Sequence, residues 1–205
     1  HLVHYKRASG RLAVNRITKN NLTTIGSETH DTTVESGYTS VRAFRTNAGA
    51  YVMFLNSNTG KMTVRPLATN GKVGAPVDNR NWSVGWTSAE TFTIAGKPYV
   101  MIHKSQGGLT EIYAFDVNGR VGAKMSSQLL PQSAPGWGVN GDVVDTDTFE
   151  IYQVGSKTFM MRVNKVTGEQ DVRTITVAQG KATLSKVVSS TRWTVGWTNV
   201  ETYAI

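Results

Sequence analysis

Two stretches of the sequence carry residue types that could bind a sugar or catalyse its hydrolysis. They read WSVGWTSAETF at 82–92 and WTVGWTNVETY at 193–203. A tryptophan ring can cover the apolar face of a pyranose, and a glutamate can serve as an ion ligand or as one of a glycosidase's paired carboxylates. Both stretches share the spacing Trp-x-Val-Gly-Trp-Thr-x-x-Glu-Thr-aromatic. The structural unit to which this repeated segment belongs must therefore position the tryptophan and glutamate side chains.

The repeat extends over the whole chain. The glycine of GWT, Gly85 or Gly196, has counterparts at Gly37 in SGYTSVRAF and Gly141 in NGDVVDTDTF, roughly fifty residues apart. After each copy come an apolar segment, a glycine turn and an alternating segment, and Asn-Gly turns at 70–71 and 118–119 indicate hairpins. Units of four short strands and this length are typical of propeller blades. No stretch has the sustained period of a helix.

We therefore expect one all-β domain, a four-bladed β-propeller of four-stranded antiparallel blades. The predicted blades span about 37–84, 85–140 and 141–196, and a further blade combines 197–205 with 1–36. This last blade, shared between the N- and C-terminus, closes the ring. A β-sandwich is the alternative architecture, but it would not require the two chain ends to complete one repeat.

An axial polar cluster follows if the repeated segment is the inner strand of each blade. The residue two before the aromatic that ends the segment then faces the axis, which selects Arg42, Glu90, Asp147 and Glu201. Neighbouring carboxylates raise one another's pKa and an arginine lowers it. Such a cluster could be an ion-paired plug, hold an ion or water in the central channel, or form a catalytic carboxylate site. The short predicted loops leave little material for a deep substrate pocket, which disfavours catalysis.

Aromatic residues on or beside the repeated segments are the candidate ligand-binding residues. An indole at a blade boundary either packs into the seam between two sheets or offers its face to a sugar, and both interpretations remain open. The candidates are Trp82, Trp86, Trp193, Trp197, Trp137 and Tyr38.

Composition excludes several other kinds of site. The chain has no cysteine, and its four histidines lack metal-ligand spacing, so we expect no disulfide, metal or cofactor. The net charge of +8 favours anionic partners, but the scattered Lys and Arg residues argue against nucleic acid. No apolar run is long enough to cross a bilayer. The low charged fraction and abundant glycine suit a secreted protein.

The order GWTS-x-x-x-F, YVM, G-x-x-x-I and NG-x-G resembles the tandem repeats of secreted bacterial propeller proteins, including propeller lectins and tectonin-like propellers. The resemblance implies a propeller fold and an extracellular location. We expect a non-enzymatic, lectin-like protein that binds carbohydrate or glycoconjugates by aromatic stacking, with weak sites strengthened by repetition. A protein-binding scaffold, such as an inhibitor or toxin-targeting module, is the alternative. A small glycoside hydrolase with axial carboxylates is a third hypothesis.

Overall fold

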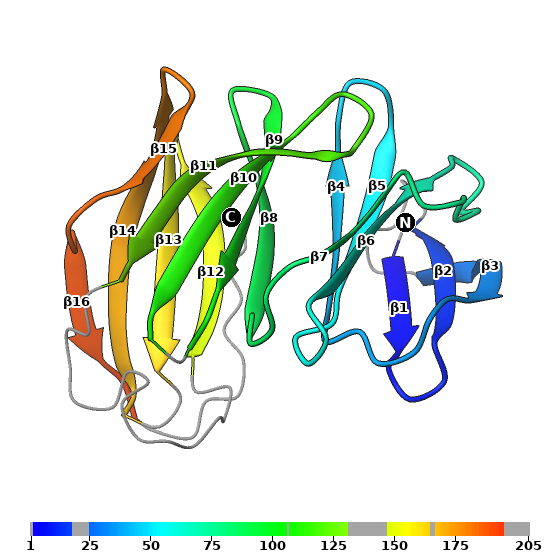
Figure 1. Ribbon diagram of the computed structural model, residues 1–205, viewed down its shortest axis with the longest axis horizontal. Helices are drawn as coiled ribbons and strands as arrows, with labels where there is room; N and C mark the ends of the chain where they lie inside the picture. Colours follow the sequence, from blue (N-terminus) through cyan, green and yellow to red (C-terminus); the bar gives the residue numbers. More distant parts are fainter. Residues whose placement is uncertain (1, 18–24, 106, 131–146, 165–166, 195–205) are drawn as a thin grey trace. The chain divides into compact units, whose positions relative to one another are not determined.

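The computed structural model describes residues 2–17, 25–105, 107–130, 147–164 and 167–194. Within these ranges the chain forms β-strands and no helix, so the predicted all-β class is confirmed. The strands form four antiparallel sheets, each built from consecutive strands of the chain (Figure 1). No helix in this part of the chain is long and apolar enough to cross a membrane.

Each sheet occupies one stretch of the sequence. The first contains β1 (Leu2–Lys6), β2 (Arg11–Ile17) and β3 (Ile25–Thr33). The second contains β4 (Ser40–Arg45), β5 (Ala50–Leu55), β6 (Lys61–Leu67) and β7 (Asp78–Asn81). The third contains β8 (Ser88–Ile94), β9 (Lys97–His103), β10 (Leu109–Phe115) and β11 (Val121–Leu129).

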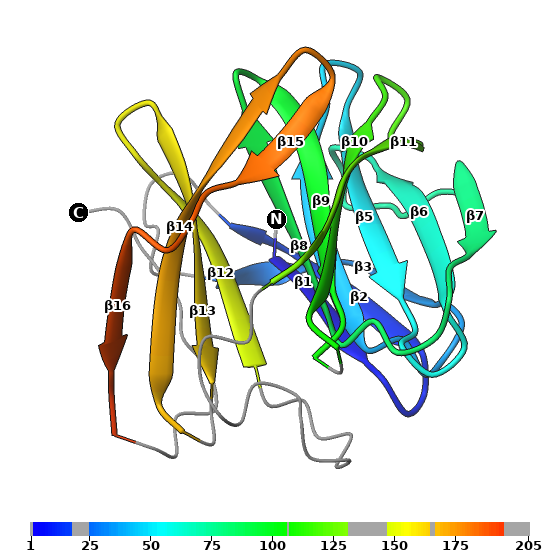
Figure 2. The ribbon, with the colours of Figure 1, turned by 60° about the vertical axis from the view of Figure 1, so that its left-hand side comes forward.

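The fourth sheet departs from this regular order. Its strands are β12 (Asp147–Val154), β13 (Lys157–Asn164), β14 (Glu169–Ala178), β15 (Lys181–Leu184) and β16 (Ser189–Arg192). Both β15 and β16 pair with β14, one along each half of that strand (Figure 2). The segment 197–205, which the sequence assigns to the first sheet, lies outside the described residues.

A repeated aromatic pair defines the register of three sheets. Tyr51 lies opposite Phe44, Tyr99 opposite Phe92, and Phe159 opposite Tyr152. In all three pairs the rings stack with centroids 5.5 Å apart. Cross-strand aromatic pairs stabilise an antiparallel ladder. Because the pair recurs at the same register, β4, β8 and β12 are equivalent strands, and each is an edge strand of its sheet.

The chain divides into two compact units, each with its own core. Unit 1 comprises 1–84 and 115–121, and unit 2 comprises 85–114 and 122–205. Leu12, Val52 and Phe54 form the core of unit 1 with Val34 and Tyr38. The core of unit 2 joins the third and fourth sheets through Phe92, Tyr99, Met101, Ile112, Phe149, Met160, Ile175 and Leu184.

A glycine turn within the sheet contacts the backbone of the segment that follows the sheet's last strand. Gly60 and Gly168 have positive φ angles of 75° and 73°. A Cβ at these positions would lie 1.9 Å from the carbonyl oxygen of Trp82 and 2.0 Å from that of Trp193. The amides of the same tryptophans donate to the glycine carbonyls at 2.8 Å. The backbone of Trp82 and Trp193 therefore has a structural role that explains part of the sequence repeat.

Candidate functional site

The ladder register corrects one member of the predicted axial cluster. Arg42 lies opposite Met53, Glu90 opposite Met101, and Glu150 opposite Met161. These three are equivalent because the stacked aromatic follows each of them by two positions. Asp147 instead lies opposite Asn164, at the beginning of β12. The prediction of Asp147 was wrong by three residues, because Tyr152 rather than Phe149 is the aromatic that matches Phe44 and Phe92.

Unit 2 places two of these acidic positions on neighbouring strands. β8 and β12 contact each other, and they carry Glu90 and Glu150, both partly exposed. The Gln153 side-chain amide donates to the Thr93 carbonyl oxygen at 2.5 Å, and these two residues are equivalent in register. The two glutamates, three positions earlier, therefore lie at the same level along the two strands. Arg42 belongs to unit 1, and Glu201 lies outside the described residues.

The aromatic candidates differ sharply in exposure. Trp86 and Tyr38 are buried, with 2 % and 4 % of their surfaces exposed. The Tyr38 hydroxyl is 3.1 Å from the Thr63 hydroxyl, and the Lys104 ammonium lies 4.8 Å from the centroid of the Trp86 ring. These two rings pack in the interior and are closed to a stacked sugar. Trp82 is half-buried and Trp193 is exposed, whereas Trp137 and Trp197 lie outside the described residues.

His103, which the sequence analysis did not select as a site residue, is buried beside polar and aromatic groups. His103 ends β9, and its ring is 4.4 Å from that of Phe149 on β12. The His103 Nδ1 is 2.8 Å from the Thr110 hydroxyl, which donates its single proton to the Gly108 carbonyl oxygen at 3.3 Å. The contact at Nδ1 and the neighbouring Phe149 ring hold the His103 side chain in the interior of unit 2, where it is 1 % exposed.

Two buried guanidinium groups lie on the adjoining strands of the same unit. Arg162 on β13 is the cross-strand partner of Phe149 and is 1 % exposed. Its Nη2 donates to Asp171 Oδ2 at 2.6 Å, and Nε of Arg173 is 3.5 Å from Asp171 Oδ1. The Arg173 Nη1 also donates to the Ser185 carbonyl oxygen at 3.0 Å. One carboxylate thus lies against two guanidiniums.

These residues place an imidazole and two guanidiniums in the interior of unit 2, because His103 and Arg162 are each 1 % exposed and Arg173 is 4 % exposed. An imidazole can act as a base, and a guanidinium can stabilise an oxyanion or a phosphate that reaches it. His103, Arg162 and Asp171 all lie where β9 and β13 end and β8, β12 and β14 begin. The sequence does hold a signal for the arginine. In the aligned segments YVMF, YVMI and FMMR, Arg162 replaces Phe54 and Ile102 at an apolar position.

A second polar network in unit 2 is fully satisfied. Glu111 on β10 accepts hydrogen bonds from the Lys124 ammonium at 2.8 Å, the Tyr113 hydroxyl at 2.6 Å and the Ser127 hydroxyl at 3.2 Å. Burial alone would raise the pKa of Glu111, but these hydrogen bonds hold it below its usual value. The network ties β10 to β11. No group of three potential metal-ligating side chains occurs among the residues that the structure describes.

Comparison with known proteins identifies the fold. No protein-family profile and no curated protein matches the sequence. A candidate 6-phosphogluconolactonase from Bacteroides uniformis matches with a TM-score of 0.58 and 13 % identity, over 92 % of this chain and 53 % of that one. The Pseudomonas aeruginosa periplasmic gluconolactonase PpgL matches with a TM-score of 0.54 and 12 % identity, over 95 % and 53 %.

A second candidate 6-phosphogluconolactonase, from Bacteroides fragilis, matches with a TM-score of 0.55 and 15 % identity, over 94 % of this chain and 54 % of that one. The chain therefore spans about half the length of these solved structures. At such low identity the similarity establishes a β-propeller-like all-β fold. It says nothing about individual residues.

The predicted non-enzymatic, lectin-like function is contradicted by these neighbours, which are named as lactonases and hence as hydrolases. The same finding overturns the prediction that the protein is not an enzyme. The physical reason lies in the repeat itself. It encodes glycine turns, stacked aromatic pairs and buried rings, which are requirements of the sheets and carry no information about activity.

Proposed function

We propose that this chain forms the propeller-like part of a hydrolase that opens sugar lactones. The observation that carries the proposal is the fold shared with three lactonases over more than nine-tenths of the chain. The buried imidazole of His103 and the buried guanidiniums of Arg162 and Arg173 are the groups that we assign to the reaction, which requires the unit to open for its substrate. The net charge of +8 favours an acidic or phosphorylated lactone, because a positive field raises the local concentration of anions.

The proposed reaction is general-base hydrolysis of an ester. Nε2 of His103 takes a proton from a water molecule while the water oxygen bonds to the lactone carbonyl carbon. The carbonyl oxygen becomes an oxyanion, which positive charge from Arg162 and Arg173 stabilises. The ring C–O bond then breaks and the leaving oxygen takes the proton back from the imidazolium. Lactone and water thus give one hydroxy acid.

The remaining polar groups have supporting roles in this proposal. Asp171 lies against both guanidiniums, and the Thr110 hydroxyl holds the His103 ring through its contact with Nδ1.

We also propose that residues 197–205 complete the first sheet and close a four-bladed ring. The first sheet has three described strands, one fewer than the second and third sheets. The sequence at 197–205 matches the inner strand of the other repeats. A chain that ends at residue 194 should then be less stable in unit 1, and unit 1 should unfold at a lower urea concentration.

Acid release measured at constant pH tests the lactonase proposal. We expect the protein to accelerate hydrolysis of glucono-δ-lactone, of its 6-phosphate, or of both, above the spontaneous rate measured with heat-denatured protein. Faster turnover of the phosphorylated lactone would support the role assigned to the positive charge. Spontaneous rates with both lactones, from protein whose circular dichroism shows folded β-sheet, would refute the proposal.

A further inference from the structure

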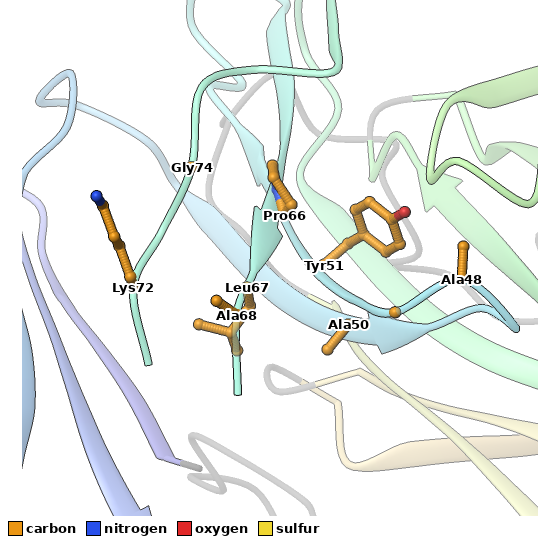
Figure 3. Close-up of a pocket in the computed structure, with 9 residues that line it drawn as sticks. Ala48, Ala50, Tyr51, Pro66, Leu67, Ala68, Lys72 and Gly74 are labelled. Atoms are coloured by element: carbon orange, nitrogen blue, oxygen red, sulfur yellow. The ribbon is translucent and has the colours of Figure 1, made fainter. Parts of the chain in front are cut away.

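Two hairpin turns of unit 1 dock on a sheet of the same unit. Gly71, in the turn after β6, lies so close to the first sheet that a Cβ there would be 2.3 Å from the Thr29 hydroxyl oxygen. Gly119, in the turn after β10, approaches Tyr51 of the second sheet in the same way, with a Cβ 2.5 Å from Cδ1 of the ring. Tyr51 stands beside Pro66, its cross-strand neighbour on β6 (Figure 3). Each of these turns is therefore a strap, a turn that docks on a second sheet.

The strap at Gly119 is also held through its main chain. The Val121 amide donates to Asp78 Oδ2 at 2.8 Å, and Arg80 Nη2 donates to the Val121 carbonyl oxygen at 2.7 Å. The Thr46 hydroxyl donates to the Val117 carbonyl oxygen at 2.7 Å. These hydrogen bonds stabilise the docked position of the strap.

The equivalent turn of the fourth sheet makes no such contact. Gln179 and Gly180 have positive φ angles of 49° and 73° and form a two-residue turn between β14 and β15. A Cβ on Gly180 would meet nothing within 4 Å, and Ala178 and Lys181 on either side are exposed. The described part of the fourth sheet therefore lacks the strap found at the other two turns.

The outer strand of the fourth sheet is also divided. β15 and β16 have four residues each and pair with different halves of β14 (Figure 2). Every residue of β16 is exposed, and Val154, Val187 and Val188 beside the strands of this sheet are exposed as well. Short, exposed strands with few buried apolar contacts are typical of regions that open locally.

The interior of the fourth sheet is polar at a position where the second and third sheets carry an apolar residue. The equivalent cross-strand pairs are Phe54 with Thr63, Ile102 with Glu111, and Arg162 with Asp171. Of these three pairs, only Arg162 with Asp171 is charged on both sides. Both of its members regain hydration when they are exposed, so their burial stabilises the closed sheet less than an apolar pair would.

We propose that the fourth sheet is a gate, which moves away from the third sheet while unit 1 stays folded and admits small molecules to His103 and Arg162. The motion separates Phe149 and Met160 from the apolar core that they share with the third sheet, so the open form is a minor state. The gate supplies the opening that lactone hydrolysis requires, and this role rests on the proposed function. The motion itself does not.

Two matched cysteine variants test the motion, because the chain has no cysteine of its own. Met160 on β13 and Val52 on β5 are equivalent, since they lie opposite Arg173 and Arg65, and both are 0 % exposed. We expect the Met160→Cys thiol to react with iodoacetamide at least about tenfold faster than global unfolding of that variant allows, a difference of about 1.4 kcal/mol in opening free energy. The Val52→Cys thiol should react only as fast as global unfolding allows.

Urea dependence distinguishes local opening from a lower stability of the variant. Opening of one sheet exposes less surface than unfolding, so labelling of Met160→Cys should rise less steeply with urea than the unfolding equilibrium does. Ala182→Cys, a smaller change in the same core, is a second probe if Met160→Cys does not fold. Labelling that follows global unfolding in both of these variants, as in Val52→Cys, would overturn the gate.

A cross-link tests whether the motion serves the reaction. The Gln153 side chain on β12 reaches the Thr93 carbonyl oxygen on β8, so a short bis-maleimide should join Thr93→Cys to Gln153→Cys across the two sheets. The control joins Val154→Cys to Lys157→Cys, which are cross-strand partners within the fourth sheet. We expect only the first link to slow hydrogen exchange of the β13 amides and to remove lactone hydrolysis.

The outcomes of the cross-link separate the gate from the proposed function. Slower exchange with unchanged hydrolysis would overturn the role of the gate in the reaction, and equal effects of the two links would overturn the gate itself. Absence of hydrolysis in the unlinked protein would refute the proposed function but not the motion, which thiol labelling measures without any substrate.

Discussion

Gly168 and Gly180 flank the same strand, β14, and provide a matched pair for the glycine turns of this fold. Both have a φ of 73°. A Cβ on Gly168 would lie 2.0 Å from the Trp193 carbonyl oxygen, whereas a Cβ on Gly180 would meet nothing within 4 Å. Replacing each by alanine therefore adds the same backbone strain and differs only in the close contact.

The expected costs follow from these two components. An alanine in the left-handed backbone region destabilises the folded state by about 1–2 kcal/mol. Alanine also lowers the conformational entropy of the unfolded chain, which offsets about 0.4–1 kcal/mol of this loss. Gly180→Ala should thus lower the free energy of unfolding by about 1 kcal/mol. Gly168→Ala must also displace the Trp193 segment, which strains packing by about 1–3 kcal/mol and breaks a hydrogen bond worth about 0.5–1.5 kcal/mol. Its loss should be about 2–4 kcal/mol larger.

Urea unfolding measures both variants, with tryptophan fluorescence and far-ultraviolet circular dichroism recorded on the same samples. Trp193 is 38 % exposed, so displacement of its segment should also red-shift the emission of folded Gly168→Ala. Equal losses for the two variants would refute the explanation of the repeated glycine by close approach. They would leave backbone strain as its only cause.

Other substitutions test the buried groups of unit 2. Burial raises the pKa of Glu111, but its hydrogen bonds lower the pKa further, so the folded pKa lies below the unfolded value. The ionised carboxylate therefore stabilises the protein above the usual glutamate pKa, and this contribution disappears as the pH falls. Glu111→Gln should therefore flatten the stability profile measured by urea unfolding between about pH 5 and pH 3. Asp171→Ala removes the carboxylate that lies against two buried guanidiniums and should cost about 3–5 kcal/mol in the same assay. Trp86→Ala should cost about 3–5 kcal/mol, whereas a change below 1 kcal/mol would contradict its place in the core.

The sequence predicted the sheets well because their determinants repeat. Positive-φ glycines and stacked aromatic pairs recur at nearly constant spacing, so four units of antiparallel strands could be recognised without a structure. The error at Asp147 has a specific cause. Phe149 and Tyr152 both resemble a strand-ending aromatic, and only the ladder shows that Tyr152 pairs with Phe159.

The candidate site was harder to predict because its residues do not repeat. His103 occupies the position of Leu55 and Val163, and Arg162 that of Phe54 and Ile102. A search for repeated chemistry overlooks such single replacements. Their proximity depends on packing between the third and fourth sheets, through Phe149, which the sequence does not specify. A charged residue in an otherwise apolar repeat position was the available signal.

The central claim is that His103 acts as the base in lactone hydrolysis, and the pH dependence of kcat tests it most directly. His103→Gln should lower kcat by about 10²–10⁴-fold and remove the imidazole-dependent limb of the profile. His4→Gln, at an exposed position in unit 1, should leave both unchanged. An active protein in which folded His103→Gln retains the kcat and the pH profile of the unaltered chain would contradict the account.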